Sequence, residues 1–186
     1  MNPILYIRNE QHCTIRQASQ DDAKSLAFIR LQIDQETDYL DREPGEGVLS
    51  EEAIQFLIDS DLNTMNRLFL IAEVDGEIVG FARCEGSVLA RKSHTVEFGV
   101  GILQAHWELG LGSAILRYVL DWARTEGLHK VTLSVIETNK KAIALYERYG
   151  FEVEGRLRDD KLIDGQHFDT ILMGYLIPSV TIPENK

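Results

Sequence analysis

The sequence predicts a single α/β domain of the mixed α+β kind, in which about four helices flank a predominantly antiparallel mixed sheet of about seven strands. Three observations support this prediction. The chain has 186 residues, 44% of them hydrophobic, which is enough to bury a core without disulfides or a metal ion. Two strand-like runs meet at Asp75-Gly76, a strong hairpin signal. A run of antiparallel strands then leads into a β-α-β-α-β order, which indicates a mixed sheet with helices packed on it.

The N-terminal part is predicted to contain one strand and two helices. The strand is expected at 13–17 and the first helix at 20–35, where two aspartates favour the helix N-terminus. One proline and two glycines predict a loop over 37–48. Ser50 then caps a second helix whose first turn is acidic.

The remaining elements follow from alternating and helical patterns of apolar residues. No repeat, low-complexity stretch or linker interrupts the chain, so residues 1–186 are expected to form one domain. The expected strands are 68–74, 77–84, 94–103, 130–136, 151–157 and 170–177, and the expected helices are 110–126 and 139–149.

The net charge of -11 comes from 30 acidic and 19 basic residues, and it argues against a nucleic-acid partner. The acid is concentrated, because residues 31–64 hold ten acidic side chains and only one basic one, Arg42. A solvated acidic face is one interpretation. The other is a surface that attracts an amine.

Several classes of protein are not expected. No apolar run approaches the roughly 20 residues of a membrane span, and residues 1–10 show no secretory signal, so we expect a cytoplasmic protein without a membrane partner. Cys13 and Cys84 lack metal-ligand or CxxC spacing and are expected to be buried thiols in a reducing compartment. The five histidines form no i, i+4 pair, so no metal site is expected.

The segment 103–113, LQAHWELGLGS, leaves a strand and enters a helix. Gly110 and Gly112 let the backbone turn tightly and approach a ligand. The first helical turn offers unpaired N–H groups and the positive end of the helix dipole, which suits a phosphate or pyrophosphate. A dinucleotide fingerprint would need glycine where Ile115 stands, and a GxxxxGK[ST] loop is absent. Tight packing at the helix start is the alternative explanation of the glycine pair.

About 30 residues downstream the chain reads Asn139-Lys-Lys-Ala-Ile-Ala-Leu-Tyr146-Glu-Arg-Tyr-Gly150-Phe151. The succession of strand, glycine turn, helix, strand and N-x-x-A-x-x-L-Y-x-x-x-G-F resembles the GNAT superfamily of N-acetyltransferases. The resemblance is specific over about 97–155, and elsewhere it rests on the order of elements. The tail from Glu154-Gly155 onward looks like a bacterial branch that acetylates small amines or protein amino groups.

The resemblance implies a GNAT-type fold in which a splayed strand pair holds acetyl-CoA, with a cofactor-binding core at about 94–155 and acceptor-side helices at about 20–62. The turn at 109–113 would bind the pyrophosphate through backbone N–H groups, and the neighbouring strand end would pair with the pantetheine arm and polarise the thioester carbonyl. The cofactor-binding residues implied are Ile102, Leu103, Leu109, Gly110, Leu111, Gly112, Ser113 and Asn139.

One position departs from the family pattern. Trp107 stands three residues before the first glycine, where the family usually has Arg or Gln. The neighbouring Glu108 is electrostatically unfavourable beside a pyrophosphate unless it points to solvent. We therefore expect cofactor affinity to depend on backbone groups more than on basic side chains, with Lys140 and Lys141 as candidate partners of the outer phosphate.

Tyr146 is the catalytic acid that the resemblance implies, placed near the sulfur to protonate the leaving thiolate. A phenol of pKa about 10 is well matched to a thiol of pKa about 8.5. The alternative is a core tyrosine with a satisfied hydroxyl. Glu97 is the candidate general base, because alternation places it on the face of Gly99 and opposite Phe98. Its alternative is a plain edge-strand glutamate in a salt bridge, and His94 and His106 are weaker candidates.

The expected acceptor is a cationic small amine such as a polyamine. Glu36 and Asp38, on the loop between the two acceptor-side helices, are the expected substrate-binding residues. If neutralising both leaves KM for the best amine unchanged at low salt, that expectation is wrong. A protein N-terminal amine acetyltransferase and a non-catalytic acyl-CoA-binding sensor are the alternatives, and family members are often homodimers. Acetyl transfer is expected to be direct, since neither cysteine falls in the motif region.

Overall fold

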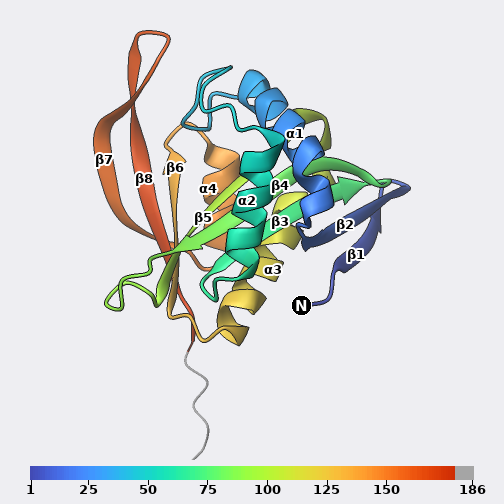
Figure 1. Ribbon diagram of the computed structural model, residues 1–186. Helices are drawn as coiled ribbons and strands as arrows, with labels where there is room; N and C mark the ends of the chain where they lie inside the picture. Colours follow the sequence, from blue (N-terminus) through green and yellow to red (C-terminus); the bar gives the residue numbers. More distant parts are fainter. Residues whose placement is uncertain (179–186) are drawn as a thin grey trace, which may run out of the picture.

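The computed structural model describes residues 1–178, which form one eight-stranded sheet with helices on both faces (Figure 1). The strand order is β1-β2-β3-β4-β5-β6-β8-β7, antiparallel except between β5 and β6. The strands are β1 (Ile4–Arg8), β2 (Gln11–Gln17), β3 (Arg67–Val74), β4 (Glu77–Gly86), β5 (Thr95–Ile102), β6 (Lys130–Ile136), β7 (Glu152–Ile163) and β8 (Gln166–Leu176). The helices are α1 (Ala23–Glu36), α2 (Glu51–Leu62), α3 (Leu111–Thr125) and α4 (Lys140–Arg148), with short 3₁₀ turns η1 (Gln20–Asp22) and η2 (Gln104–Leu109).

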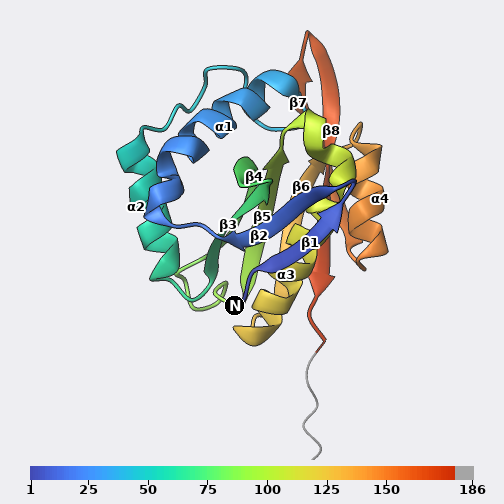
Figure 2. The same ribbon diagram turned by 90° about the vertical axis from the view of Figure 1, so that its right-hand side faces the viewer.

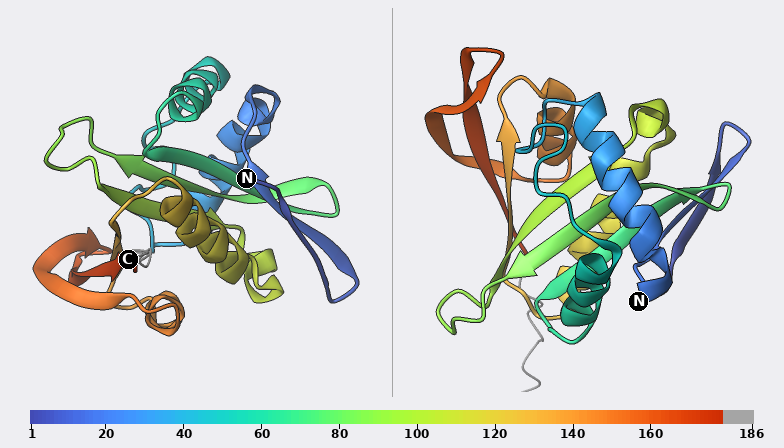
Figure 3. Two further views of the ribbon diagram at one scale, coloured as in Figure 1. Left: turned by 90° about the horizontal axis from the view of Figure 1, so that it is seen from below. Right: turned by 45° about the horizontal axis from the view of Figure 1, so that its top comes forward.

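The four α-helices form two layers around the sheet. Helices α1 and α2 cover one face, and α3 and α4 cover the other (Figures 2 and 3). The central strand β3 is buried along almost its whole length, as expected for a strand covered on both faces. The predicted fold class and the mixed, mostly antiparallel sheet are therefore confirmed. None of the helices within residues 1–178 is long and apolar enough to cross a bilayer.

The sequence prediction missed strand β1, so the sheet has eight strands rather than seven. The β1–β2 turn is made by Asn9 and Glu10, whose φ angles are 49° and 65°. Both residues adopt the left-handed conformation without a glycine, so the turn shows no glycine-containing hairpin signal. The hairpin also reaches the glycine turn, since the Tyr6 hydroxyl donates a hydrogen bond to the Leu109 carbonyl at 3.1 Å.

The β7–β8 hairpin is longer than predicted and extends beyond the body of the protein (Figure 1). Most of β7 is exposed, so the alternation of apolar and polar residues that predicts a strand is absent there. The pairing is also irregular between Leu157 and Lys161. Asp164 and Gly165 make its turn with φ angles of 48° and 76°.

The parallel pair in the centre of the sheet opens into a gap. Strands β5 and β6 pair only over Thr95–Glu97 with Lys130–Thr132. Beyond Glu97, β5 continues to pair with β4, whereas β6 continues to pair with β8. The carboxyl-terminal halves of β5 and β6 therefore diverge, which confirms the splayed strand pair that the resemblance implied.

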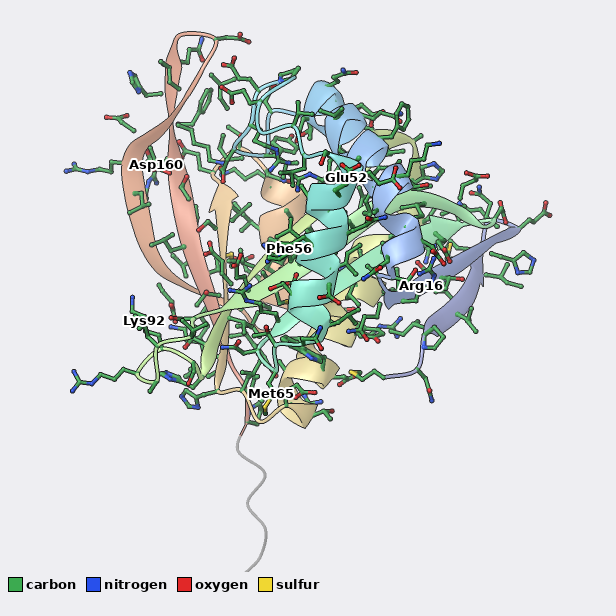
Figure 4. The ribbon with its side chains drawn as sticks, viewed as in Figure 1. Arg16, Glu52, Phe56, Met65, Lys92 and Asp160 are labelled. Atoms are coloured by element: carbon green, nitrogen blue, oxygen red, sulfur yellow. The ribbon has the colours of Figure 1, made fainter. Side chains whose placement is uncertain are left out.

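Ion pairs tie the helices of the α1–α2 face to the sheet. Arg16 of β2, which is labelled in Figure 4, donates hydrogen bonds to Asp22 of η1 and Glu73 of β3. Asp61 of α2 is buried and accepts two hydrogen bonds from Arg83 of β4, at 2.6 and 2.9 Å. These contacts fix the helix layer that forms one wall of the gap.

Candidate active site

A cleft of about 970 Å³ lies where β5 and β6 diverge. Its lining includes 97–102 of β5, Ser134 and Val135 of β6, and residues at the starts of α3 and α4. Residues of α1 and of the loop that follows it line the other side. The cleft therefore reaches both faces of the sheet through the gap, so two molecules could meet there from opposite sides.

The glycine turn lies at one end of this cleft. Gly110 has φ 80° and ψ 11°, a left-handed conformation that favours glycine. The side chains of Leu109 and Leu111 are buried and anchor the turn in the core. The N–H groups of the first helical turn have no acceptor within the helix, and Gly110, Gly112 and Ser113 line the cleft.

Close packing also explains the second glycine. A Cβ atom at Gly112 would lie 3.3 Å from Leu145 Cδ2 of α4, so a larger side chain would push α3 and α4 apart. The Tyr149 hydroxyl of α4 donates to the Ser113 carbonyl at 3.1 Å. The glycine pair therefore lines the cleft and also allows α3 and α4 to pack closely beside it.

Basic side chains accompany the glycine turn. Arg8, Lys140 and Lys141 line the same cleft, as does Glu108. Sequence reasoning did not identify Arg8, because it lies at the end of the missed strand β1. The glycine-turn end of the cleft thus offers cations in addition to backbone N–H groups.

The backbone of β5 presents hydrogen-bonding groups to the gap. The Leu103 N–H donates to the Val79 carbonyl of the β3–β4 side at 3.0 Å. Because such bonds alternate along an antiparallel pair, the backbone groups of Val100 and Ile102 face the gap instead. Leu103 also accepts a hydrogen bond from the His106 N–H, so both of its backbone groups are used within the protein.

Trp107, at the position that departs from the family pattern, connects two segments of the protein. Its indole Nε1 donates to the Ile102 carbonyl at 2.6 Å. Its ring stacks on Tyr39, with 6.2 Å between ring centroids. The tryptophan therefore joins the end of β5 to the loop after α1, and leaves the N–H of Ile102 as the group that faces the gap.

Tyr146 lies in the cleft wall with only 7% of its surface exposed. Its ring packs edge-on against Phe98 and beside Phe151. Burial raises the pKa of its hydroxyl to about 12. Within residues 1–178 this hydroxyl has no hydrogen-bond partner, so the alternative of a core tyrosine with a satisfied hydroxyl does not describe it.

Glu97 lies on the opposite face of β5 from Phe98, as the alternation predicted. Its side chain is exposed, lines the cleft and takes part in no ion pair within the described part of the chain. A Cβ atom at the neighbouring Gly99 would meet nothing within 4 Å. Open space therefore exists beside this carboxylate on the face of β5 that lies opposite Phe98.

Asn139 caps helix α4 and also lines the cleft. Its Oδ1 accepts a hydrogen bond from the Ala142 N–H at 3.1 Å, which satisfies one of the free donors of the helix start. The Nδ2 group donates no hydrogen bond within residues 1–178. The amide therefore keeps a donor for a ligand in the cleft.

The two residues expected to bind the acceptor do not line this cleft. Glu36 accepts hydrogen bonds from the Gln104 N–H at 2.8 Å and from the Gln32 side chain at 3.1 Å, so its carboxylate joins α1 to η2. Asp38 is exposed and is absent from the lining. Arg30, Arg42 and Arg83 line the cleft instead. The sequence signal for Arg30 is its position, since this arginine falls within the apolar stripe of the first helix.

The cysteines are both buried and free of disulfide bonds, as expected. Burial raises the pKa of the Cys84 thiol, and neither thiol lines the cleft. Neither is therefore placed to carry an acetyl group.

Comparison with known proteins agrees with this geometry. Residues 28–151 match the model of the acetyltransferase (GNAT) family. The L-amino acid N-acetyltransferase AaaT of Escherichia coli is 31% identical over 108 residues, which are 56% of this chain and 65% of that protein. The spermidine N(1)-acetyltransferase of Escherichia coli is 30% identical over 121 residues, 63% of this chain and 62% of that protein. The matched regions thus span just under two thirds of these relatives.

Solved structures match over nearly the whole described chain. An acetyltransferase of the GNAT family from Streptococcus pneumoniae superposes with a TM-score of 0.86 at 28% identity, covering 89% of this chain and 99% of that one. The yncA protein of Salmonella typhimurium, solved with its cofactor acetyl-CoA, gives a TM-score of 0.80 at 21% identity, covering 94% of this chain and 99% of that one. Because the family model matches two thirds of the residues of this chain, the chain belongs to the acetyltransferase (GNAT) family.

Proposed function

We propose that this protein transfers the acetyl group of acetyl-CoA to a primary amine by direct transfer in a ternary complex. One observation carries the proposal: a single cleft joins the glycine turn at 110–113, the open backbone of β5 and the Tyr146 side chain. The relatives named for acetylation of L-amino acids and spermidine, and the fold neighbour solved with acetyl-CoA, support it.

The cleft offers a partner for each part of acetyl-CoA. The N–H groups of the turn at 109–113 would bind the pyrophosphate at the positive end of α3, with Arg8, Lys140 and Lys141 near it. Asn139 Nδ2 would donate to the CoA arm. These assignments retain the predicted turn residues and the two candidate lysines, and they add Arg8, which the sequence did not indicate.

We assign the pantetheine contact to Val100 and Ile102 rather than to Leu103. The backbone groups of Val100 and the N–H of Ile102 face the gap, whereas both groups of Leu103 are bonded, to Val79 and His106. The N–H groups aimed into the gap would also polarise the thioester carbonyl, since backbone donors directed at a developing oxyanion stabilise it strongly.

The chemistry requires one bond to form and one to break. The neutral amine nitrogen attacks the acetyl carbonyl carbon, the new C–N bond forms and the C–S bond breaks. Tyr146 donates its hydroxyl hydrogen to the leaving thiolate, while the attacking nitrogen loses a proton. Glu97, exposed on the acceptor face beside Gly99, would accept that proton through water.

Three functional alternatives are separated by one experiment. Release of free thiol from acetyl-CoA would be measured across polyamines, amino acids, aminoglycosides and peptides. Turnover with small amines supports the proposal, and turnover confined to peptides supports protein N-terminal acetylation. Tight CoA binding without turnover of any amine would instead identify a sensor and overturn the proposal. Within the small amines, a polyamine is the acceptor that the acidic composition predicted.

The pH dependence follows from the buried phenol. An alkyl amine of pKa about 10 becomes a nucleophile only as it loses its proton, so kcat/KM is expected to rise from pH 7 toward pH 10. Since burial raises the pKa of Tyr146 to about 12, the acid stays protonated over this range and no falling limb appears below about pH 11. Initial rates at saturating acetyl-CoA from pH 6 to 10.5 test this. A falling limb below pH 9 would show that the acid is another group.

A further inference from the structure

We infer that the acceptor is a primary amine that also carries a carboxylate, as an amino acid does, and that Arg30 binds this carboxylate. The inference rests on the proposed function and names its substrate class. It departs from the polyamine that the overall acidity predicted, because the charge of the cleft differs from that of the chain.

The cleft is locally basic although the protein is acidic. Eight lysine and arginine residues line it, against the four carboxylates of Asp41, Glu85, Glu97 and Glu108. On the acceptor side the cations are Arg30, Arg42, Arg83 and Lys161.

Three of these four cations are already paired. Arg42 donates two hydrogen bonds to Asp34, both at 2.9 Å, and Lys161 lies 2.5 Å from Asp41. Arg83 is held by the buried Asp61 and by Glu85. Asp34, Asp41 and Asp61 belong to residues 31–64, so part of the acid in this segment neutralises cations of the protein rather than attracting an amine.

Arg30 is the exception on this wall. Its side chain is half-buried, and its guanidinium lies over the Phe81 ring at 5.7 Å from the centroid. Within residues 1–178 it has neither an ion pair nor a hydrogen bond. Burial, and the nearby charges of Arg42 and Arg83, lower the pKa of Arg30. A half-buried, unpaired guanidinium beside two other arginines is stabilised by an anion that enters the cleft.

The position of Arg30 relates it to the reacting centre. Phe81, beneath its guanidinium, pairs across the strands with Gly101 of β5. Gly101 lies between Val100 and Ile102, whose backbone groups face the gap. The planar guanidinium binds a carboxylate through two parallel hydrogen bonds, so it would fix the orientation of an acceptor whose amine lies close to its carboxylate.

The test compares matched substrates in matched variants. Several L-amino acids would be assayed as acceptors, each beside its carboxamide, which keeps the amine but loses the negative charge. Spermidine would be assayed separately as the polycationic acceptor. The enzymes would be wild type, Arg30→Gln, Arg30→Lys and the control Arg91→Gln, which alters an exposed arginine outside the cleft. Acetyl-CoA dissociation constants measured for each variant show whether the cofactor end remains folded.

We expect wild type to prefer the amino acids over their amides by roughly 10- to 100-fold in kcat/KM. Arg30→Gln should abolish this preference by lowering kcat/KM for the acids alone, Arg30→Lys should restore part of it, and Arg91→Gln should leave it unchanged. Equal or better turnover of amides or spermidine, or an equal loss for acids and amides in Arg30→Gln, would overturn the inference while the proposed function stands. If no amine of any class is acetylated, the proposed function fails instead.

Discussion

Tyr146→Phe is expected to lower kcat by about 10²- to 10³-fold while changing the dissociation constant of acetyl-CoA less than about twofold. The ring is held by Phe98 and Phe151, and phenylalanine keeps those contacts. The hydroxyl has no partner within residues 1–178, so its removal leaves no protein group unsatisfied. What is lost is the hydrogen that the thiolate takes as the C–S bond breaks.

The matched control is Tyr118→Phe. Tyr118 is buried in α3 away from the cleft, and its hydroxyl reaches only the Met1 carbonyl at 3.4 Å. Steady-state kinetics with the best amine and calorimetric titration of acetyl-CoA should separate the two variants, because only Tyr146→Phe affects the chemical step. If kcat of Tyr146→Phe stays within threefold of wild type, another group protonates the thiolate and Tyr146 is a packing residue.

The elements that sequence reasoning located are those whose local chemistry and tertiary role agree. Asp75 and Gly76 adopt φ angles of 51° and 86°, as their hairpin signal predicted. Ser50 caps α2 by accepting a hydrogen bond from the Ala53 N–H. The apolar residues that helix α3 buries recur at helical intervals along its length. In each case a few neighbouring residues carry the information.

The elements that it missed depend on partners far away in the sequence. Strand β1 is held by pairing with β2, and its outward side chains Leu5 and Ile7 are exposed, which obscures the apolar alternation. Most of β7 is exposed and charged. The tertiary pairing that stabilises these strands has no local pattern from which it can be predicted.

The charge of the active site could not be predicted for the same reason. A count along the chain places ten acidic residues in 31–64. In the fold, however, Asp34 and Asp61 are buried and form ion pairs with Arg42 and Arg83. The Glu36 carboxylate accepts a hydrogen bond from the Gln104 N–H of η2. Among the described residues, Arg30, from just before the acidic segment, is left as the arginine of the acceptor wall that has no carboxylate partner. Pairing in three dimensions thus decides which charges remain free in the cleft, and the composition alone does not show this.

Asp61→Ala is expected to lower the free energy of unfolding by about 3 to 5 kcal/mol and Tm by roughly 10 °C. Asp61 is only 2% exposed and holds Arg83 through two hydrogen bonds, with Arg67 3.8 Å away. Removing the carboxylate leaves two partly buried guanidinium groups facing each other, with only the half-exposed Glu85 to balance them. Urea unfolding followed by circular dichroism measures the change.

Asp121→Ala provides the comparison, because Asp121 pairs with Arg124 on the exposed surface of α3, where such a pair contributes at most about 1 kcal/mol. The two substitutions remove the same charge, so the difference between their effects on the free energy of unfolding measures what burial adds.

The double variant Asp61→Leu, Arg83→Met should recover much of the stability, since it leaves no buried charge unpaired. If Asp61→Ala costs no more than Asp121→Ala, the arginines of the acceptor wall do not need their carboxylates. An unpaired Arg30 would then not be a special feature of that wall, and substrate selectivity would have to come from elsewhere in the cleft.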